Sequence, residues 1–373
     1  MSTMSKMPQT SEHLLYLMAC ALQGVSAREE ILANVDMKQL LIIARKHSVA
    51  SMVCMALEKT AIFANADEAE KKQWLENKNK AIRKNMLLDA ERKVILHELE
   101  TQGIWYMPLK GSILKDWYPK PGMREIFQNR GYKTVSFSKG NHDEYEKAPI
   151  YNFEMHVSLF HGMYKELAEQ YKNVKEYLLP VDGTAYQFAF TPEDFYVFAL
   201  AHAHKHYSHS GTGVRTLADI YVMDRHLGDI MDRDEVEEKL TQLGIAEYEQ
   251  HSRVLAEKLF SAVRPLAEIE LTEDEKEMLL YYCDATTYGT VDNRVNNRLH
   301  ELQENSEGIT LRTKLKYCCV RLFPGKEFCK SFYPFVYRHL WILPLFWVWR
   351  IVDKGITNRK KVKQELSSLR KYK

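Results

Sequence analysis

The side chains that could carry out chemistry lie in two short stretches near the middle of the chain. Lys110, Gly111 and Ser112 form a turn, and Glu154 and His156 share one parity of an alternating segment downstream. A Gly-Ser turn before a helix offers backbone N–H groups to phosphate oxygens. A carboxylate such as that of Glu154 can hold a divalent metal ion, which assists displacement at phosphorus. These residues point to phosphate binding and metal-assisted group transfer.

The elements that would position these residues are short strands set between helices. Residues 104–109 are apolar and partly aromatic, which predicts a buried strand before the turn, and residues 113–117 are predicted to begin a helix. Residues 131–137 and 150–159 alternate like strands. Helical patterns occupy the first hundred residues and resume at Thr191-Pro192, a cap residue followed by proline.

We therefore predict an α+β fold, mostly helical, with a small truncated mixed β-sheet flanked by N- and C-terminal helical regions. The predicted divisions are an N-terminal helical region, an α/β core, a C-terminal helical domain and a basic aromatic tail. Their boundaries are 1–102, 103–165, 166–305 and 306–373.

Composition and charge indicate a globular chain with an unusual tail. The 373 residues are 45% hydrophobic and 27% charged, which excludes disordered and fibrous classes. Residues 311–373 carry 16 Lys and Arg against 3 Asp and Glu, a balance of +13 that leaves −11 on the rest. Such a split predicts an anionic partner for the tail.

The cysteines and the first ten residues favour a cytoplasmic location. Six cysteines show no CxxC spacing, and residues 1–10 are polar rather than basic and then apolar. We expect reduced thiols and no secretory signal. The longest apolar run, residues 340–349, is interrupted by Pro344 and is too short to span a bilayer.

The order of the motifs resembles the uncharacterised bacterial nucleotidyltransferase-like proteins of the DNA-polymerase-β-type fold. The matching segments are 109–111, 118–124, 131–132, 154–156, 202–206 and 211–215 with Asp219. The resemblance implies Mg²⁺-dependent transfer of a nucleotidyl group from a nucleoside triphosphate to an unknown acceptor. It assigns phosphate binding to Lys110, Gly111, Ser112 and Arg124, a catalytic metal-ligand role to Glu154, and an accessory role to His156.

The chain departs from this family at its metal site. Only six residues, 125–130, separate Arg124 from Gly131, where the family places an Asp-x-Asp strand, a turn and most of a helix. About 20 residues are therefore missing. In the family the two aspartates bind the metals, and Glu154 alone cannot hold two divalent ions. We predict a pseudoenzyme whose Mg²⁺ site is incomplete, with a distorted or incomplete sheet around residues 120–160.

Other readings of these residues stay open. Asp143, Glu144 and Glu146 are acids near the gap, but Gly140-Asn141 predicts a turn and an exposed run of charge. Each site residue also has a purely structural interpretation. Gly111 can be a tight-turn glycine and Lys110 a surface lysine. Glu154 can be a solvated strand residue, and Arg124 can pair with an acid. On these readings the chain is a non-catalytic module that binds a nucleotide or a protein. His202, His206 and His209 form a helical stripe that suits either zinc or helix packing.

The tail predicts contact with an anionic membrane surface through residues 335–373. It holds three of the six tryptophans, with basic residues around them, as membrane-interface segments do. The alternative is a helix packed on the body of the protein. Nucleic-acid binding is not predicted, because no known module accompanies the charge. The expected location is therefore cytoplasmic, peripheral to the inner face of the membrane.

Overall fold

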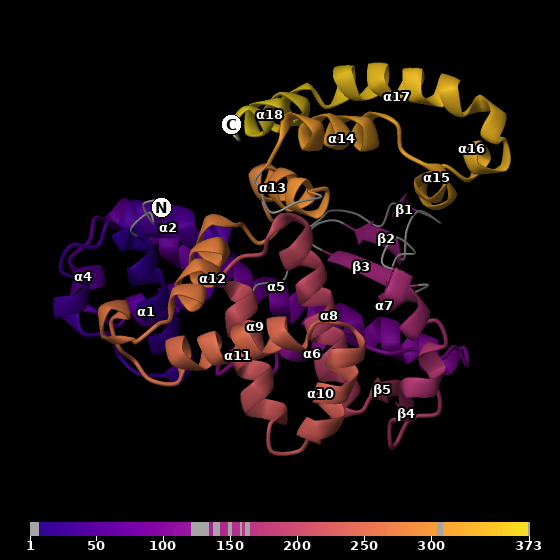
Figure 1. The fold of residues 1–373 in the computed structure, drawn as a ribbon. Coiled ribbons are helices and arrows are strands. Elements are labelled where there is room, and N and C mark those ends of the chain that lie inside the picture. The colour runs from indigo at the N-terminus through magenta and orange to yellow at the C-terminus, as the bar shows by residue number, and fades with distance from the viewer. Residues whose placement is uncertain are drawn as a thin grey trace. The chain divides into compact units, whose positions relative to one another are not determined.

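The protein is mostly helical, which confirms the predicted α+β class (Figure 1). In place of the one small mixed sheet that was predicted, the described strands form two small sheets. The structure is a computed structural model that describes residues 7–120, 134–136, 142–147, 151–156, 159–160, 165–303 and 309–371. For residues 134–136, 142–147 and 151–156 it describes the backbone alone. The chain divides into two compact units, each assembled from segments that are far apart in sequence.

The first unit comprises residues 1–128, 175–204 and 212–287. Its elements are α1 (Gln9–Gln23), η1 (Glu29–Leu32), α2 (Met37–Lys46), α3 (Ala50–Leu57), α4 (Ala61–Ala64), α5 (Glu68–Thr101), α6 (Gly111–Leu114), β4 (Leu178–Pro180), β5 (Phe188–Phe190), α8 (Pro192–Ser210), α9 (Arg215–Leu227), α10 (Arg233–Gln242), α11 (Ala246–Phe260), η3 (Leu266–Glu268) and α12 (Glu273–Asp284).

The second unit comprises residues 129–174, 205–211 and 288–373, so it includes the last turn of α8. Its other elements are β1 (Thr134–Ser136), β2 (His142–Lys147), β3 (Tyr151–His156), α7 (Lys165–Gln170), α13 (Val291–Glu301), α14 (Leu311–Leu322), α15 (Lys326–Phe332), α16 (Pro334–Arg338), η4 (Leu340–Ile342), α17 (Leu343–Thr357) and α18 (Arg359–Lys371). The short helix η2 (Val174–Tyr177) lies across the boundary between the units.

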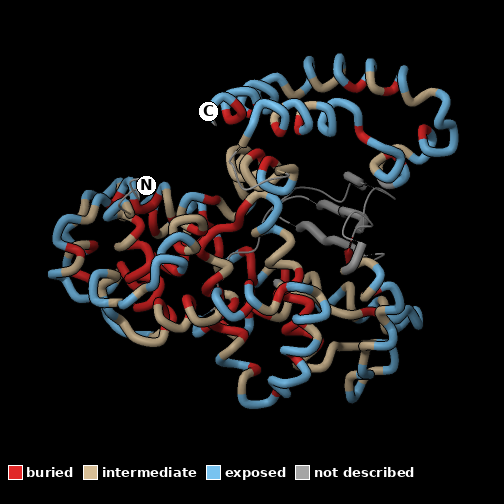
Figure 2. The backbone as a smooth tube through the Cα atoms, in the orientation of Figure 1, coloured by how far each residue is buried: buried red, intermediate tan, exposed pale blue. Residues whose placement is uncertain are grey.

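Helix α1 forms the centre of the first unit. It packs against α2, α3 and α11, and every residue from Leu14 to Leu22 is buried (Figure 2). Its last residue, Gln23, donates hydrogen bonds from Nε2 to the hydroxyl of Tyr221 and to the carbonyl of Phe260. Gly24 then ends the helix in the left-handed conformation, as its position in the sequence predicts. The core of this unit is therefore built around its first helix.

Two helix starts that the sequence predicts are confirmed. The backbone N–H of Asp194 donates to Thr191 Oγ1 at 3.1 Å, which caps α8. Thr272 and Glu275 form a reciprocal capping box at the start of α12. These caps satisfy donors that the first helical turn leaves unpaired.

The strand predicted at residues 104–109 is wrong. Of these residues only Tyr106 pairs, in a single parallel bridge with Gln187. Its N–H donates to the carbonyl of Tyr186 at 3.0 Å, and its own carbonyl accepts from Phe188 N at 2.9 Å. Ile104 and Trp105 are about half exposed. Pro108 has no N–H to donate, so the pairing cannot extend past it as a regular ladder.

Asp143, Glu144 and Glu146 lie in strand β2 and not in a turn, whereas the Gly140-Asn141 pair lies outside the described residues. This strand pairs antiparallel with β3 along its whole length and with β1 on its other side. The register shifts between Thr134 and Ser136. Charged residues have low intrinsic strand propensity, and here pairing with a neighbouring strand overrides it. The described strand pairings in both sheets are antiparallel.

A buried acid holds the helices of the second unit together. Glu365 on α18 accepts from Arg321 Nη2 on α14 at 2.9 Å and also pairs with Arg294 on α13. Val295, Leu299, Tyr317 and Leu369 pack as an apolar cluster between the same three helices. One carboxylate with two arginines therefore joins elements that are up to 71 residues apart.

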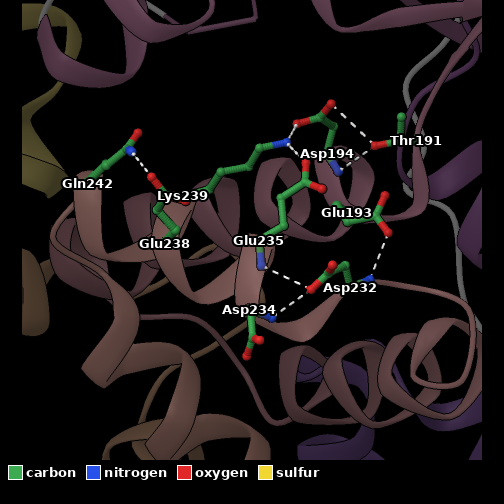
Figure 3. A network of polar contacts seen from close by, with 9 residues as sticks. All are labelled: Thr191, Glu193, Asp194, Asp232, Asp234, Glu235, Glu238, Lys239 and Gln242. Carbon is green, nitrogen blue, oxygen red and sulfur yellow. Dashed lines mark hydrogen bonds and ion pairs between the residues drawn. The ribbon is translucent and has the colours of Figure 1, made fainter.

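A polar network links the starts of α8 and α10 in the first unit (Figure 3). Lys239 Nζ lies 2.6 Å from Asp194 Oδ1, and the Asp194 side chain is only 8% exposed. Glu193 accepts from the backbone N–H of Asp232 at 2.9 Å, and Asp232 in turn caps α10. Because Asp194 is buried, its charge depends on the Lys239 ammonium.

Lys239→Met should therefore lower the free energy of unfolding by about 2–3 kcal/mol, because it leaves the Asp194 carboxylate buried without its cation. Urea denaturation would measure the loss. Lys276→Met is the matched control, since Lys276 pairs with Glu273 on the surface and should cost under about 1 kcal/mol. Equal effects from the two substitutions would contradict the role of Lys239.

Buried His47 makes stability depend on pH. Its Nδ1 accepts the Val214 N–H at 3.4 Å, and burial lowers its pKa to about 4. The unfolded chain, with an ordinary histidine pKa, binds the proton first, so stability falls as the pH drops from about 6.5 to about 4. We expect a loss of about 2 kcal/mol from His47 between pH 7 and pH 5. Burial lowers the pKa of His13, His204 and His209 too, which adds in the same direction.

Urea titrations at pH 7, 6 and 5 would measure this slope. In His47→Gln the loss between pH 7 and pH 5 should be smaller by about 2 kcal/mol, because glutamine does not titrate. An unchanged slope in that variant would show that His47 does not control it.

Candidate functional site

The turn at residues 109–112 holds its lysine in a strained backbone conformation. Lys110 has φ 40° and ψ −101°, close to the first central residue of a type II′ turn. That position strongly favours glycine, because a side chain there crowds the backbone. Ser112 N donates to the Leu109 carbonyl at 3.1 Å, which closes the turn. Strained non-glycine residues of this kind cluster at functional sites, so Lys110 is the strongest candidate in the turn.

Ser112 uses its hydrogen-bonding groups within the protein. Its hydroxyl donates to the Leu109 carbonyl at 2.8 Å, in addition to the backbone bond, and its carbonyl accepts from Arg92 Nη1 at 2.7 Å. The helix that follows, α6, has only four residues, shorter than the segment predicted from the sequence. Phosphate binding here would therefore depend on the Lys110 ammonium and the turn backbone more than on a helix dipole.

Charged residues on α5 contact the turn and the residues that follow it. Asp89 Oδ2 lies 2.9 Å from Lys115 Nζ, and Asp89 Oδ1 lies 3.3 Å from Arg92 Nη2. The side chain of Lys115 is only 4% exposed, so its charge needs the two acids that pair with it, Asp89 and Asp116. Asp89 thus pairs with Arg92, which bonds to the Ser112 carbonyl at the end of the turn, and with Lys115, which follows the turn.

The segment after the turn is attached to α9. Tyr118 is buried, and its hydroxyl donates to Asp219 Oδ1 at 2.7 Å. Trp117 stacks on His226, with 4.3 Å between ring centroids. Tyr118 and Asp219 belong to two of the motifs that carry the family resemblance, and they are 101 residues apart. The fold thus brings these two motifs into direct contact.

Glu154 and His156 lie on β3, where the register gives each a matched neighbour on β2. Glu144 is directly opposite Glu154, and His142 is directly opposite His156. Both pairs are set by the backbone register of the two strands. Sequence reasoning missed this pairing because it interpreted Gly140-Asn141 as a turn and the acids after it as an exposed run of charge.

The remaining predicted residues divide between the units or lie elsewhere. Lys110, Gly111 and Ser112 belong to the first unit, whereas Glu154 and His156 belong to the second. Arg124 and the 125–126 junction lie outside the described residues. Among the residues that the structure describes, no group of three or more His, Cys, Asp or Glu side chains could hold a metal ion. The zinc reading of His202, His206 and His209 thus gains no support.

Comparison with protein families matches the model of a family described as uncharacterised nucleotidyltransferase over residues 33–127 and 124–261. The chain belongs to this nucleotidyltransferase family. The match covers the turn, the Tyr118–Asp219 contact and β3, and thus all the residues assigned from the resemblance. No curated protein and no solved structure matches the chain.

The family match is divided at the place where the sequence departs from the motif pattern. Its two segments meet at residues 124–127, beside the junction between Glu125 and Ile126. The Lys110 turn lies in the first matched segment, and helices α9 and α11 lie in the second.

The bond between Tyr118 and Asp219 should contribute measurably to stability. Tyr118→Phe removes a hydrogen bond to a charged acceptor and should lower the unfolding free energy by about 1.5–3 kcal/mol. A double-mutant cycle with Asp219→Ala should give a coupling energy of about 1 kcal/mol or more. Tyr337→Phe, at an exposed tyrosine, is the control and should change little. Strictly additive effects of Tyr118→Phe and Asp219→Ala would refute the contact.

Proposed function

We propose that this chain is a nucleotidyltransferase-family protein that binds a nucleoside triphosphate through the Lys110 turn and has an impaired transfer step. The observation that carries the proposal is the six-residue interval between Arg124 and Gly131, where the resemblance places the metal-binding Asp-x-Asp strand. The division of the family match at residues 124–127 supports it. The strained Lys110 supports retained binding, since strain persists where a residue's placement matters.

The residues present do not fit the pair of Mg²⁺ ions that the family resemblance implies. Two ions that bridge the reacting phosphate need several carboxylate oxygens from the protein. Glu154 has one acidic neighbour in register, Glu144, and residues 125–130, between Arg124 and Gly131, contain no aspartate. We therefore assign no catalytic step to a metal. What the chain's own residues would do is hold phosphate oxygens with the Lys110 ammonium and the backbone of the turn.

A second candidate function is residual Mg²⁺-dependent transfer, with Glu144 replacing a lost aspartate. The backbone register that sets Glu144 opposite Glu154 favours it, because glutamate is a residue type that binds divalent ions. The acceptor of the nucleotidyl group is the same unknown in both candidates.

Calorimetry with ATP, in Mg²⁺ and in EDTA, tests the first candidate. We expect binding that Mg²⁺ does not tighten, and a roughly 10- to 100-fold weaker affinity in Lys110→Ala, which loses one charge-assisted contact. Lys80→Ala, at an exposed lysine of α5, is the matched control and should bind normally. Unchanged affinity in Lys110→Ala would overturn the assignment of the turn.

A glycine substitution at Lys110 tests the role of the lysine side chain separately from the backbone strain. Lys110→Gly should be more stable than Lys110→Ala by about 1 kcal/mol, because glycine accepts the positive φ, yet it should bind ATP as poorly as the alanine variant. The glycine variant would then be the more stable of the two variants, while both bound ATP equally weakly. If the glycine variant bound ATP normally, the lysine side chain would not be the ligand.

Transfer itself is tested with ATP labelled at the α-phosphate, in Mg²⁺, on the whole protein with cell extract as a source of acceptor. We expect no label transfer above a no-protein control. Mg²⁺-dependent transfer that disappears in both Glu144→Gln and Glu154→Gln would instead establish the second candidate.

A further inference from the structure

One face of α17 carries an apolar stripe whose side chains are exposed among the residues that the structure describes. The stripe consists of large apolar residues, each between 52% and 79% exposed: Leu345, Val348, Trp349, Val352 and Ile356 on α17, with Trp341 of η4 just before them. At 100° per residue these positions fall within about one third of the helix circumference. Figure 2 draws most of this helix in pale blue, the colour of exposed residues.

The opposite face of α17 is fixed to the second unit, so the helix cannot turn its stripe inward. Phe346 is buried with Cys329 and Val336 in an apolar cluster. Trp347 Nε1 donates to the Pro324 carbonyl at 3.1 Å, and Arg350 Nη1 donates to the Arg321 carbonyl at 2.9 Å. The helix therefore has two apolar faces, one used for packing and one presented to the surroundings.

Positive charge follows the stripe directly. Arg359, Lys360, Lys361 and Lys363 open α18 and are all exposed. The charged residues of α17 itself, Arg350, Asp353 and Lys354, lie away from the stripe by helical spacing. An exposed aromatic and aliphatic face bordered by lysines matches the interface of an anionic bilayer, where tryptophan favours the headgroup level and lysine the lipid charge.

We infer that α17 and the start of α18 dock on the surface of an anionic membrane, with the stripe inserted at the headgroup boundary. No helix among the described residues is both long and apolar enough to cross a bilayer, so the contact is one of a helix lying in the plane of the interface. The occupant is a lipid surface rather than a second copy of the chain, because the exposed lysines beside the stripe complement anionic headgroups, whereas the stripe itself offers no acid to pair with them in a second copy.

Vesicle co-sedimentation of the full-length protein tests this inference. We expect binding to phosphatidylcholine vesicles that contain phosphatidylglycerol, much weaker binding to phosphatidylcholine alone, and a blue shift of tryptophan emission on binding, since Trp341 and Trp349 would leave water. The paired substitution Leu345→Glu and Val352→Glu should weaken binding at least tenfold. Neutralising Lys360, Lys361 and Lys363 to glutamine should weaken it roughly a hundredfold.

The matched control places the same two glutamates on another exposed apolar pair, Met86→Glu and Val94→Glu on α5. It should bind vesicles like the unmodified protein, and circular dichroism would show that all variants fold. Equal binding by the stripe variant and the control would overturn the inference. The inference would also be overturned if the unmodified protein did not bind vesicles but formed a concentration-dependent dimer in sedimentation that the stripe variant abolished.

Discussion

The first unit depends on the burial of α1 from every side. A helix that is apolar all round is stable only when other elements cover each face. Here α2 and α3 supply two of these contacts and α11, more than two hundred residues later, supplies another. Helix α11 must therefore pack against α1 before the core of the first unit is complete. This constraint also brings α9 to the segment that follows the Lys110 turn, since α9 packs against α11.

Sequence reasoning succeeded where a local signal determines the structure. Thr191 and Thr272 start helices because their side chains cap free N–H groups, and Gly24 ends one because it accepts a positive φ. It failed where pairing partners decide. Residues 104–109 looked like a strand from composition, but only Tyr106 meets a partner, and residues 142–147 became a strand despite their charge because β3 pairs with them. Such partners leave no trace in the local sequence.

The same division applies to the candidate site. The motif order was enough to predict the family, which the match over residues 33–127 and 124–261 bears out. The strain at Lys110, the internal bonds of Ser112 and the opposition of Glu144 to Glu154 were not predictable, because each is a property of backbone geometry or register. The assignment of Glu154, His156 and Arg124 stays a prediction.

The burial of α1 also has a consequence for synthesis on the ribosome. Helix α1 emerges more than two hundred residues before α11, which covers part of it and ends at Phe260. At about 5–20 residues per second, the apolar helix waits roughly 10–50 s for that covering. During this interval it presents leucine, methionine and cysteine side chains to other chains in the cell. The nascent protein should therefore need a chaperone early, and truncations that end before α11 should aggregate rather than fold.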